Sequence, residues 1–131
     1  MIQSRQDQYL LLFNTSGKLG DHVNVQFKKG VLTLCVMVLT SSKDRYGYEL
    51  VDRISEKFMI AEGTIYPLLR RLTKEGYFTT YLVESQEGPP RKYYQLTEAG
   101  NKYLMELVEE WKMFSRAVDQ IIEEGLQLEK E

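Results

Sequence analysis

The sequence predicts a mainly α-helical α+β domain with one small β-hairpin and a long final helix. Apolar residues recur at helical spacing in residues 27–42, 48–58 and 62–75. Two runs rich in Tyr, Thr, Phe and Val follow at 77–84 and 91–96, as is typical of paired strands. A helical pattern then continues from 98 to about 126. Helices, then a hairpin, then a long helix is the order of a winged helix-turn-helix with an added C-terminal helix.

Composition limits the classes of protein to consider. The chain has 131 residues and 43% hydrophobic content, enough for one domain with its own core. The apolar run at 9–13 is too short for a signal peptide, and no run approaches the roughly 20 residues that cross a bilayer. The single cysteine, Cys35, excludes a disulfide within one chain. We therefore expect a cytoplasmic protein without a membrane partner.

The net charge of −2 is unevenly distributed. Residues 1–26 are neutral, residues 27–96 carry eleven basic and eight acidic side chains, and residues 97–131 carry four basic and nine acidic ones. The charge near the contact surface governs binding to phosphates more than the total charge does. We divide the chain into an N-terminal extension of unknown role (1–25), a winged helix-turn-helix (26–97), and a C-terminal dimerisation helix with an acidic tail (98–131).

The first helix, Phe27 to Ser42, is apolar nearly all round. Its regular stripe comprises Val31, Leu34, Cys35, Val38 and Leu39, and further apolar surface comes from Leu32, Val36 and Met37. A helix of this kind is buried on several sides. Part of that burial is expected to come from a second subunit.

The second helix, Tyr48 to Phe58, follows a polar break at 41–45. Its inward residues are expected to be Leu50, Val51, Ile54 and Phe58, and its outward residues Glu49, Asp52 and Glu56. Tyr46 and Tyr48 lie at its start, where free N–H groups and a tyrosine hydroxyl would suit a phosphate. The alternative is that both rings pack against neighbouring helices.

The third helix, Glu62 to Glu75, is the candidate recognition helix. Ile65, Leu68, Leu69 and Leu72 form its inward stripe, and the opposite face carries Gly63, Pro67, Arg70, Arg71 and Lys74, flanked by Thr64 and Tyr66. Arginine can grip guanine or phosphate with two parallel hydrogen bonds, and lysine can neutralise a phosphate. A solvated helix face is the alternative, and the hairpin that follows favours DNA contact. Pro67 is expected within the first two turns.

The hairpin connection at 85–90 contains Gly88, Pro89 and Pro90, which predicts a long, stiff tip. Arg91 and Lys92 follow it. They are expected to reach the DNA backbone or minor groove, and the alternative is that they are edge-strand charges that prevent aggregation.

The final helix begins after Thr97, its cap, and is longer than the body of a small domain. Its apolar stripe comprises Tyr103, Leu104, Leu107, Trp111, Phe114, Val118, Ile121 and Ile122. A partner helix from a second copy is the simplest cover for the surplus stripe. Trp111 is expected to be packing, or the wall of a flat hydrophobic pocket near Met37 and Phe114.

Nothing in the sequence favours catalysis or a cofactor. His22 lies in the N-terminal extension without a cysteine or carboxylate cluster beside it. Cys35 lies on an apolar face, as is typical of inert packing. Neither a glycine-rich phosphate loop nor spaced metal ligands occur.

In order along the chain, four motifs resemble the PadR family of bacterial transcriptional regulators. They are Phe27-Lys28-Lys29-Gly30-Val31-Leu32, Tyr46-Gly47-Tyr48-Glu49-Leu50, Glu62-Gly63-Thr64-Ile65-Tyr66-Pro67-Leu68-Leu69-Arg70-Arg71-Leu72 and Gly88-Pro89-Pro90-Arg91-Lys92-Tyr93-Tyr94. The resemblance covers about residues 26–124 and is to the branch with a short, single C-terminal helix. Residues 1–25 depart from it, being longer than a compact member needs.

The resemblance implies a homodimeric repressor that binds a palindromic operator. The DNA-facing residues it implies are Tyr66, Pro67, Arg70 and Arg71, with Arg91, Lys92 and Tyr93 in the wing. The helix from Glu98 to Leu126 would pack on the first helix of the partner. Some members resemble multidrug-sensing repressors in which a tryptophan stacks on flat aromatic compounds, and Trp111 occupies a comparable place.

Our complete set of expected sites follows from both arguments. Expected DNA contacts are Tyr46, Tyr48, Thr64, Tyr66, Pro67, Arg70, Arg71, Lys74, Arg91, Lys92 and Tyr93. Expected dimer contacts are Val31, Cys35, Leu104, Leu107, Trp111, Phe114, Val118, Ile121 and Ile122. The leading hypothesis is a DNA-binding repressor released by a small molecule or stress signal. The alternatives are a winged-helix module that binds protein and a carrier or sensor of a hydrophobic ligand.

Overall fold

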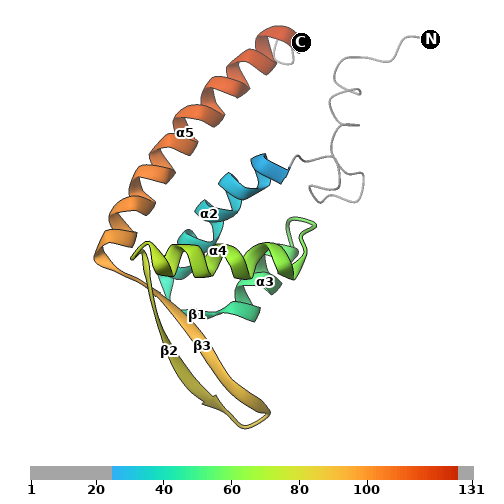
Figure 1. The fold of residues 1–131 in the computed structure, drawn as a ribbon. Coiled ribbons are helices and arrows are strands. Elements are labelled where there is room, and N and C mark those ends of the chain that lie inside the picture. Colours follow the sequence, from blue (N-terminus) through green and yellow to red (C-terminus); the bar gives the residue numbers. More distant parts are fainter. Residues whose placement is uncertain (1–24, 127–131) are drawn as a thin grey trace, which may run out of the picture.

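The computed structural model describes residues 25–126, with the side chains of residues 30–126 except Glu62. Helices α2 (Val25–Ser42), α3 (Gly47–Ser55) and α4 (Glu62–Lys74) pack together, and a hairpin of β2 (Phe78–Ser85) and β3 (Gly88–Leu96) projects from them (Figure 1). Helix α5 (Glu98–Leu126) leads away on the other side. The predicted fold class, mainly helical with a small antiparallel sheet, is confirmed. The predicted extension up to residue 24 and the end of the acidic tail, 127–131, lie outside the described residues.

The core is built from one face of each helix and the base of the hairpin. Its buried residues are Leu32, Val36, Met37, Leu50, Val51, Ile54, Ile65, Leu69, Leu72, Phe78, Tyr94 and Leu104. Burying a large apolar side chain stabilises a fold by about 1.5–3 kcal/mol relative to leaving it exposed. These twelve side chains therefore supply most of what holds the three helices and the sheet together.

The face of α2 that enters the core is not the stripe that the sequence favoured. Leu32, Val36 and Met37 are completely or almost completely buried, whereas Val38 is 44% exposed and Cys35 is half-buried. The helix is apolar on both sides, so its periodicity could not decide which side turns inward. Among the described residues, the second apolar face of α2 is only partly covered.

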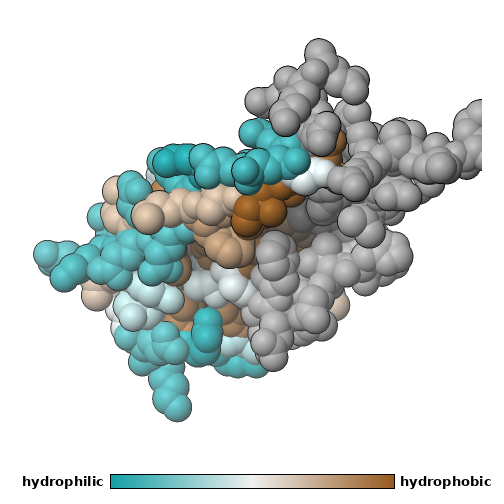
Figure 2. Space-filling view, turned by 90° about the horizontal axis from the view of Figure 1, so that it is seen from above, coloured by the Kyte–Doolittle hydropathy of each residue, from teal (hydrophilic) through white to brown (hydrophobic). Residues whose placement is uncertain are grey.

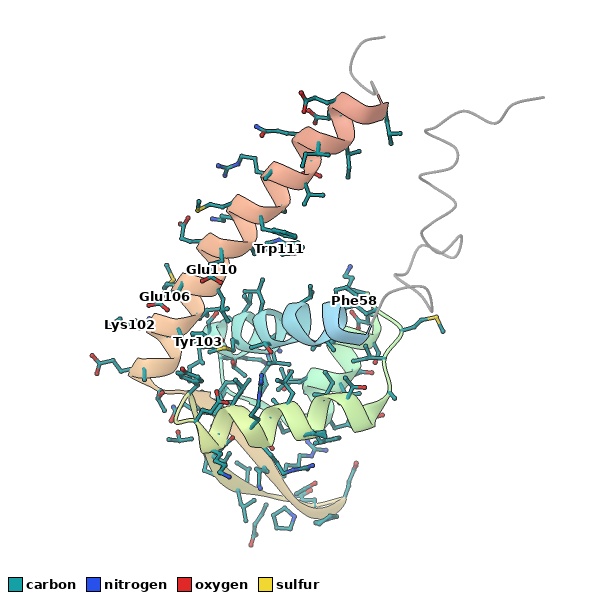
Figure 3. The ribbon with its side chains drawn as sticks, turned by 45° about the horizontal axis from the view of Figure 1, so that its top comes forward. Phe58, Lys102, Tyr103, Glu106, Glu110 and Trp111 are labelled. Carbon is teal, nitrogen blue, oxygen red and sulfur yellow. The ribbon has the colours of Figure 1, made fainter. Side chains whose placement is uncertain are left out.

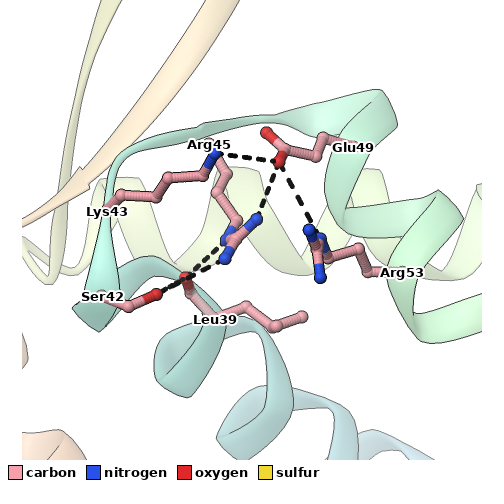
Figure 4. Close-up of polar contacts among 6 residues, drawn as sticks. All are labelled: Leu39, Ser42, Lys43, Arg45, Glu49 and Arg53. Carbon is pink, nitrogen blue, oxygen red and sulfur yellow. Dashed lines mark hydrogen bonds and ion pairs between the residues drawn. The ribbon is translucent and has the colours of Figure 1, made fainter.

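A buried arginine fixes the junction between α2 and α3. Arg45 lies in β1 (Arg45–Tyr46), a two-residue strand, and its side chain is only 8% exposed. Its Nε donates to the carbonyl of Leu39 at 2.6 Å, and its Nη1 pairs with Oε2 of Glu49 at 2.7 Å (Figure 4). Its Nη2 donates to the Ser42 hydroxyl at 3.4 Å. Glu49, expected to point outward, is thus held as the partner of a buried charge.

Helix α3 ends three residues earlier than predicted. The N–H groups of Lys57 and Phe58 both donate to the carbonyl of Ile54, which closes the helix in a turn. Phe58 and Ile60 then pack against the core, so the apolar pattern continues although the helix does not.

Helix α4 matches its prediction closely. Ile65, Leu69 and Leu72 are buried, and Leu68 packs against the core. Pro67 lies in the second turn, where its missing N–H costs one backbone hydrogen bond. Gly76 follows the helix with a φ of 89°, a left-handed conformation that glycine adopts without strain.

The sheet has the strand order β1-β3-β2 and is antiparallel throughout. Tyr46 and Tyr81 both lie opposite Tyr93, one on each side of β3. The predicted long connection is wrong, because Gly88, Pro89 and Pro90 belong to β3. Prolines are tolerated there because β1 covers only the positions of Tyr93 and Tyr94, leaving the rest of that side of β3 unpaired.

Helix α5 starts from a fixed point on the turn between α4 and β2. The Thr97 hydroxyl donates to the carbonyl of Gly76 at 2.7 Å and accepts from the N–H of Gly100 at 2.9 Å. The N–H of Thr97 donates to the carbonyl of Tyr77 at 3.1 Å. The rings of Tyr77 and Tyr103 stack with centroids 4.5 Å apart. From this anchor α5 runs for 29 residues, about 43 Å.

Within residues 25–126, no helix has the length and hydrophobicity needed to cross a membrane.

The anchor of α5 predicts that Gly100→Ala destabilises the fold. A β-carbon at Gly100 would collide with the carbonyl oxygen of Tyr77 and lie 2.9 Å from the Leu96 side chain. We expect a loss of about 1–3 kcal/mol in the free energy of unfolding, despite the better helix propensity of alanine. Gly125→Ala in the same helix is the control, because no atom lies within 4 Å of its added β-carbon. Urea denaturation measures both, and equal stability of the two variants would contradict the prediction.

Candidate nucleic-acid interface

The start of α3, the exposed side of α4 and the hairpin enclose one groove of about 640 Å³. Its lining residues are Tyr46, Gly47, Tyr48, Tyr66, Arg70, Ser85, Glu87, Gly88, Pro89, Pro90, Arg91, Lys92 and Tyr94. Six of the eleven expected DNA contacts are among them. The groove therefore brings together expected contacts that are up to 46 positions apart in the sequence, from Tyr46 to Lys92.

The ring of Tyr66 in α4 lies against Gly47 at the start of α3. A β-carbon at Gly47 would lie 2.6 Å from a ring carbon of Tyr66. Because glycine has no side chain, the tyrosine ring can take this place without a collision. Within the described part of the chain, no side chain caps this end of α3.

Arg70 extends from the exposed face of α4 into the same groove. The floor includes Tyr94, whose pKa is raised by burial and by Tyr66 and lowered in part by the positive charge of Arg70. Lys92, in β3, lines the groove from the hairpin side. Positive side chains from two separate elements thus face one space.

The structure places Arg71 elsewhere. Its Nη2 donates to the Thr33 hydroxyl at 3.4 Å, and its Nε lies 4.0 Å from Oε1 of Glu75. It lines a small, separate pocket of about 180 Å³ together with Leu32, Thr64, Pro67 and Leu68. The predicted basic face of α4 is therefore divided, with Arg70 toward the hairpin and Arg71 toward α2. Lys74 is exposed in the last turn.

Arg91 and Tyr93 lie on the other face of β3 from Tyr94. The Arg91 guanidinium carbon is 4.7 Å from the centroid of the Tyr46 ring. Tyr93 packs between Tyr46 and Tyr81, with centroid distances of 5.5 and 5.6 Å. Tyr93, expected as a DNA contact, is half-buried within this aromatic row.

The sequence argument missed Asp44 and Tyr81. The Tyr81 hydroxyl donates to Oδ2 of Asp44 at 2.6 Å, and the same oxygen accepts from Nε2 of Gln95 at 3.3 Å. The hydrogen bond to Asp44 is the main reason that the pKa of Tyr81 is raised. Tyrosines at 46, 81 and 93 were visible in the sequence, but only strand register brings them together.

A second groove lies between α2 and α5 on the far side of the molecule. It has a volume of about 490 Å³ and is lined by Gly30, Val31, Leu34, Leu107, Glu110, Trp111 and Phe114. Trp111 and Glu110 extend from the middle of α5 (Figure 3). Seen from above, hydrophobic surface lies beside a row of hydrophilic residues (Figure 2). Trp111 is 40%, Phe114 57% and Ile121 67% exposed, so residues 25–126 leave this stripe largely uncovered.

Two expected residues of this region are corrected. Leu104, expected at a dimer interface, is buried in the core of its own chain because α5 is still packed on the domain at that point. Met37, expected beside Trp111 in a ligand pocket, is completely buried on the core face of α2. Leu34 is the α2 side chain that lines the groove in its place.

The described residues contain no group of three potential ligand side chains close enough to hold a metal ion. Burial raises the pKa of the Cys35 thiol, which keeps it protonated and weakly nucleophilic at neutral pH.

Comparison with known proteins connects this geometry to a family. The model of the Transcriptional regulator PadR-like family matches residues 36–106. An uncharacterised protein from Lysinibacillus sphaericus is 38% identical over 103 residues, which is 76% of this chain and 94% of that one. A PadR-like transcriptional regulator from Bacillus cereus is 38% identical, with a TM-score of 0.66 over 74% of this chain and 96% of its own. A Streptococcus mutans protein is also 38% identical, with a TM-score of 0.68 over 72% and 89%.

The contact between Gly47 and Tyr66 predicts that Gly47→Ala reshapes the first groove. The Tyr66 ring must retreat by about 1 Å to regain ordinary contact distance. Because the atom in the way is the end of a side chain, the cost in stability is expected to stay below about 1.5 kcal/mol. NMR shifts of the Tyr66 ring should change, while those of the same ring in Gly63→Ala should not, because the space around Gly63 is open. An unmoved Tyr66 ring in Gly47→Ala would refute the prediction.

Proposed function

Because the chain belongs to the PadR-like family of transcriptional regulators, we propose that it is a homodimeric repressor that binds a palindromic operator. Members of this family are DNA-binding transcriptional regulators and not enzymes. We further propose that a small molecule or stress signal releases the repressor from its operator.

The first groove carries this proposal, because two elements that contact DNA in winged helices meet there. Tyr66 and Arg70 extend from α4, and Arg91 and Lys92 extend from the hairpin. In our proposal α4 lies in the major groove and the hairpin follows the adjacent backbone. The free N–H groups at the start of α3, with the Tyr48 hydroxyl, suit a phosphate between them.

The division of the basic face of α4 suggests different roles for its two arginines. Arg70 belongs to the groove and is proposed to contact base edges, where a bidentate contact to guanine gives sequence preference. Arg71 is already held by Thr33 and Glu75. It is proposed to contact a flanking phosphate, as are Lys74 and the Thr64 hydroxyl. Pro67 has no donor and is proposed to pack against the DNA backbone beside them. These contacts would raise affinity without choosing a sequence.

The proposed dimer uses the open faces of α2 and α5. Val31 and Cys35 lie on the part of α2 that is not buried, and Leu107, Trp111, Phe114, Val118, Ile121 and Ile122 continue along α5. An exposed apolar stripe of this length is costly in water and is typical of an interface. A two-fold dimer would present two recognition helices to two half-sites.

Arg70→Ala is therefore predicted to reduce operator affinity by about 5- to 150-fold and to relax sequence preference, as loss of one bidentate base contact does. Arg71→Ala should weaken binding to the operator and to unrelated DNA alike. The slope of log affinity against log salt concentration should become less steep by about one. Arg116→Ala, on an exposed position of α5, is the control for loss of one positive charge. Fluorescence anisotropy at several salt concentrations measures all three. Binding that ignores salt and sequence in the unaltered protein would favour the alternative, a module that binds protein.

The groove beside Trp111 favours an effector of defined chemistry. Its walls are apolar and aromatic, and Glu110 is the acidic residue among those that line it. A planar aromatic cation could place its ring on Trp111 and its charge near Glu110. We propose this class of effector as the releasing signal.

Because Trp111 is the only tryptophan, its fluorescence tests the effector directly. Planar aromatic cations are expected to quench it and to lower operator affinity. Glu110→Gln should reduce the affinity for cationic compounds more than the affinity for neutral compounds of the same shape, because only the cationic compounds lose a charge pair. Glu109→Gln, which is exposed and does not line the groove, is the matched control. An unquenched signal across a varied panel would leave Trp111 as interface packing.

A further inference from the structure

Three tyrosines and one arginine form a continuous row across one face of the sheet. Tyr46 of β1 and Tyr81 of β2 lie directly opposite Tyr93 of β3. The rings of Tyr81 and Tyr93 are stacked at an interplanar angle of 12°, and that of Tyr46 is tilted by 51° from Tyr93. The Arg91 guanidinium lies over Tyr46. The position of this wing arginine therefore depends on the ring beneath it.

Asp44 closes the other end of the row. Its Oδ2 accepts hydrogen bonds from the Tyr81 hydroxyl in β2 and the Gln95 amide in β3, so it contacts both strands of the hairpin. It also adjoins Arg45, which is fixed by Leu39 and Glu49. Asp44 thus links the hairpin to the junction of α2 and α3 that Arg45 holds.

The hairpin needs such a link. It projects from the helices (Figure 1), and beyond Phe78 its strand β2 is exposed up to Glu84. Strand β1 pairs with only two residues of β3. A two-stranded ribbon without a packed face is marginally stable in water. The base of the hairpin is held by backbone pairing and by the buried side chains of Phe78 and Tyr94. Two further ties to the body are the Asp44 contacts and the aromatic row.

We propose that Tyr81, held by Asp44, is a positioning residue for DNA binding. It fixes the tilt of the hairpin and, through Tyr93 and Tyr46, the place of the Arg91 guanidinium at the DNA. Tyr81 itself does not touch DNA in this proposal. The inference rests on the proposed DNA contact of the hairpin and adds the device that orients it.

Removal of the Asp44 charge distinguishes positioning of the hairpin from simple electrostatic repulsion of DNA, because the two predict opposite changes in affinity. Asp44 is a negative charge near a phosphate-binding groove, and its removal should strengthen DNA binding if only Coulomb attraction matters. If Asp44 orients the hairpin through Tyr81, its removal should weaken specific binding. Tyr81→Phe changes no charge and keeps the stacked ring, so it isolates the hydrogen bond.

The test compares Tyr81→Phe, Asp44→Ala and Asp44→Asn in the full chain by two measurements. Without DNA, amide hydrogen exchange of β2 and β3 should accelerate in Tyr81→Phe while exchange in α2, α4 and α5 stays unchanged. With the operator, Tyr81→Phe and Asp44→Ala should each lose about 3- to 10-fold in affinity, since a hydrogen bond to a charged acceptor is removed. Asp44→Asn keeps an acceptor oxygen and should recover most of that loss.

Tyr103→Phe is the matched control, because it removes a tyrosine hydroxyl from a stacked pair that is separate from Asp44 and from the row of Tyr46, Tyr93 and Tyr81. In an Arg91→Ala background, Tyr81→Phe should have little further effect on operator affinity, because the residue that it positions is gone. Unchanged hydrogen exchange in Tyr81→Phe overturns the proposal whether or not DNA is bound. So does tighter operator binding by Asp44→Ala. Failure of the unaltered protein to bind any DNA specifically would instead overturn the proposed function, and the exchange result would still decide the role of Tyr81.

Discussion

The arrangement of this domain depends on the buried guanidinium of Arg45. A buried charge is costly unless every donor finds a partner, and Arg45 reaches the Leu39 carbonyl, the Ser42 hydroxyl and the Glu49 carboxylate. Those partners come from the end of α2 and the start of α3. A single side chain therefore fixes the angle between two helices and the place of β1 between them. Lys43 and Arg53 also lie 3.9 and 4.0 Å from the same Glu49 oxygen, at the exposed edge of the cluster.

The contacts of Arg45 also determine how the groove of the candidate interface is built. Because β1 is held at Arg45, its neighbour Tyr46 pairs with Tyr93 and brings the hairpin beside the start of α3. Because Gly47 has no side chain, Tyr66 of α4 can lie against that same start. Helices α3 and α4 and strand β1 thus meet at three consecutive residues, 45–47. One wall of the groove therefore comes from neighbouring residues near position 46, and the other comes from α4 and the hairpin.

The opposite side of the molecule follows a different constraint. Thr97 and Gly100 fix the direction in which α5 leaves the domain, and the core covers α5 only as far as about Val108. Beyond that point its apolar stripe faces the open face of α2 across a groove. The same surface is proposed for a second subunit and for an effector. A ligand that changes the spacing of α2 and α5 would change the spacing of the two recognition helices in such a dimer.

The sequence by itself determined the elements whose pattern is local. Helical periodicity located α4 and α5 almost to the residue, and the basic face of α4 followed from the same period. Contacts between distant segments were decided by the tertiary structure. Periodicity could not choose between the two apolar faces of α2. Packing decided that Met37 lies in the core and Leu34 lies in the groove. Nor could periodicity separate Arg70 from Arg71, find a two-residue strand, or pair Tyr81 with Asp44, because packing and strand register decide which side chains meet.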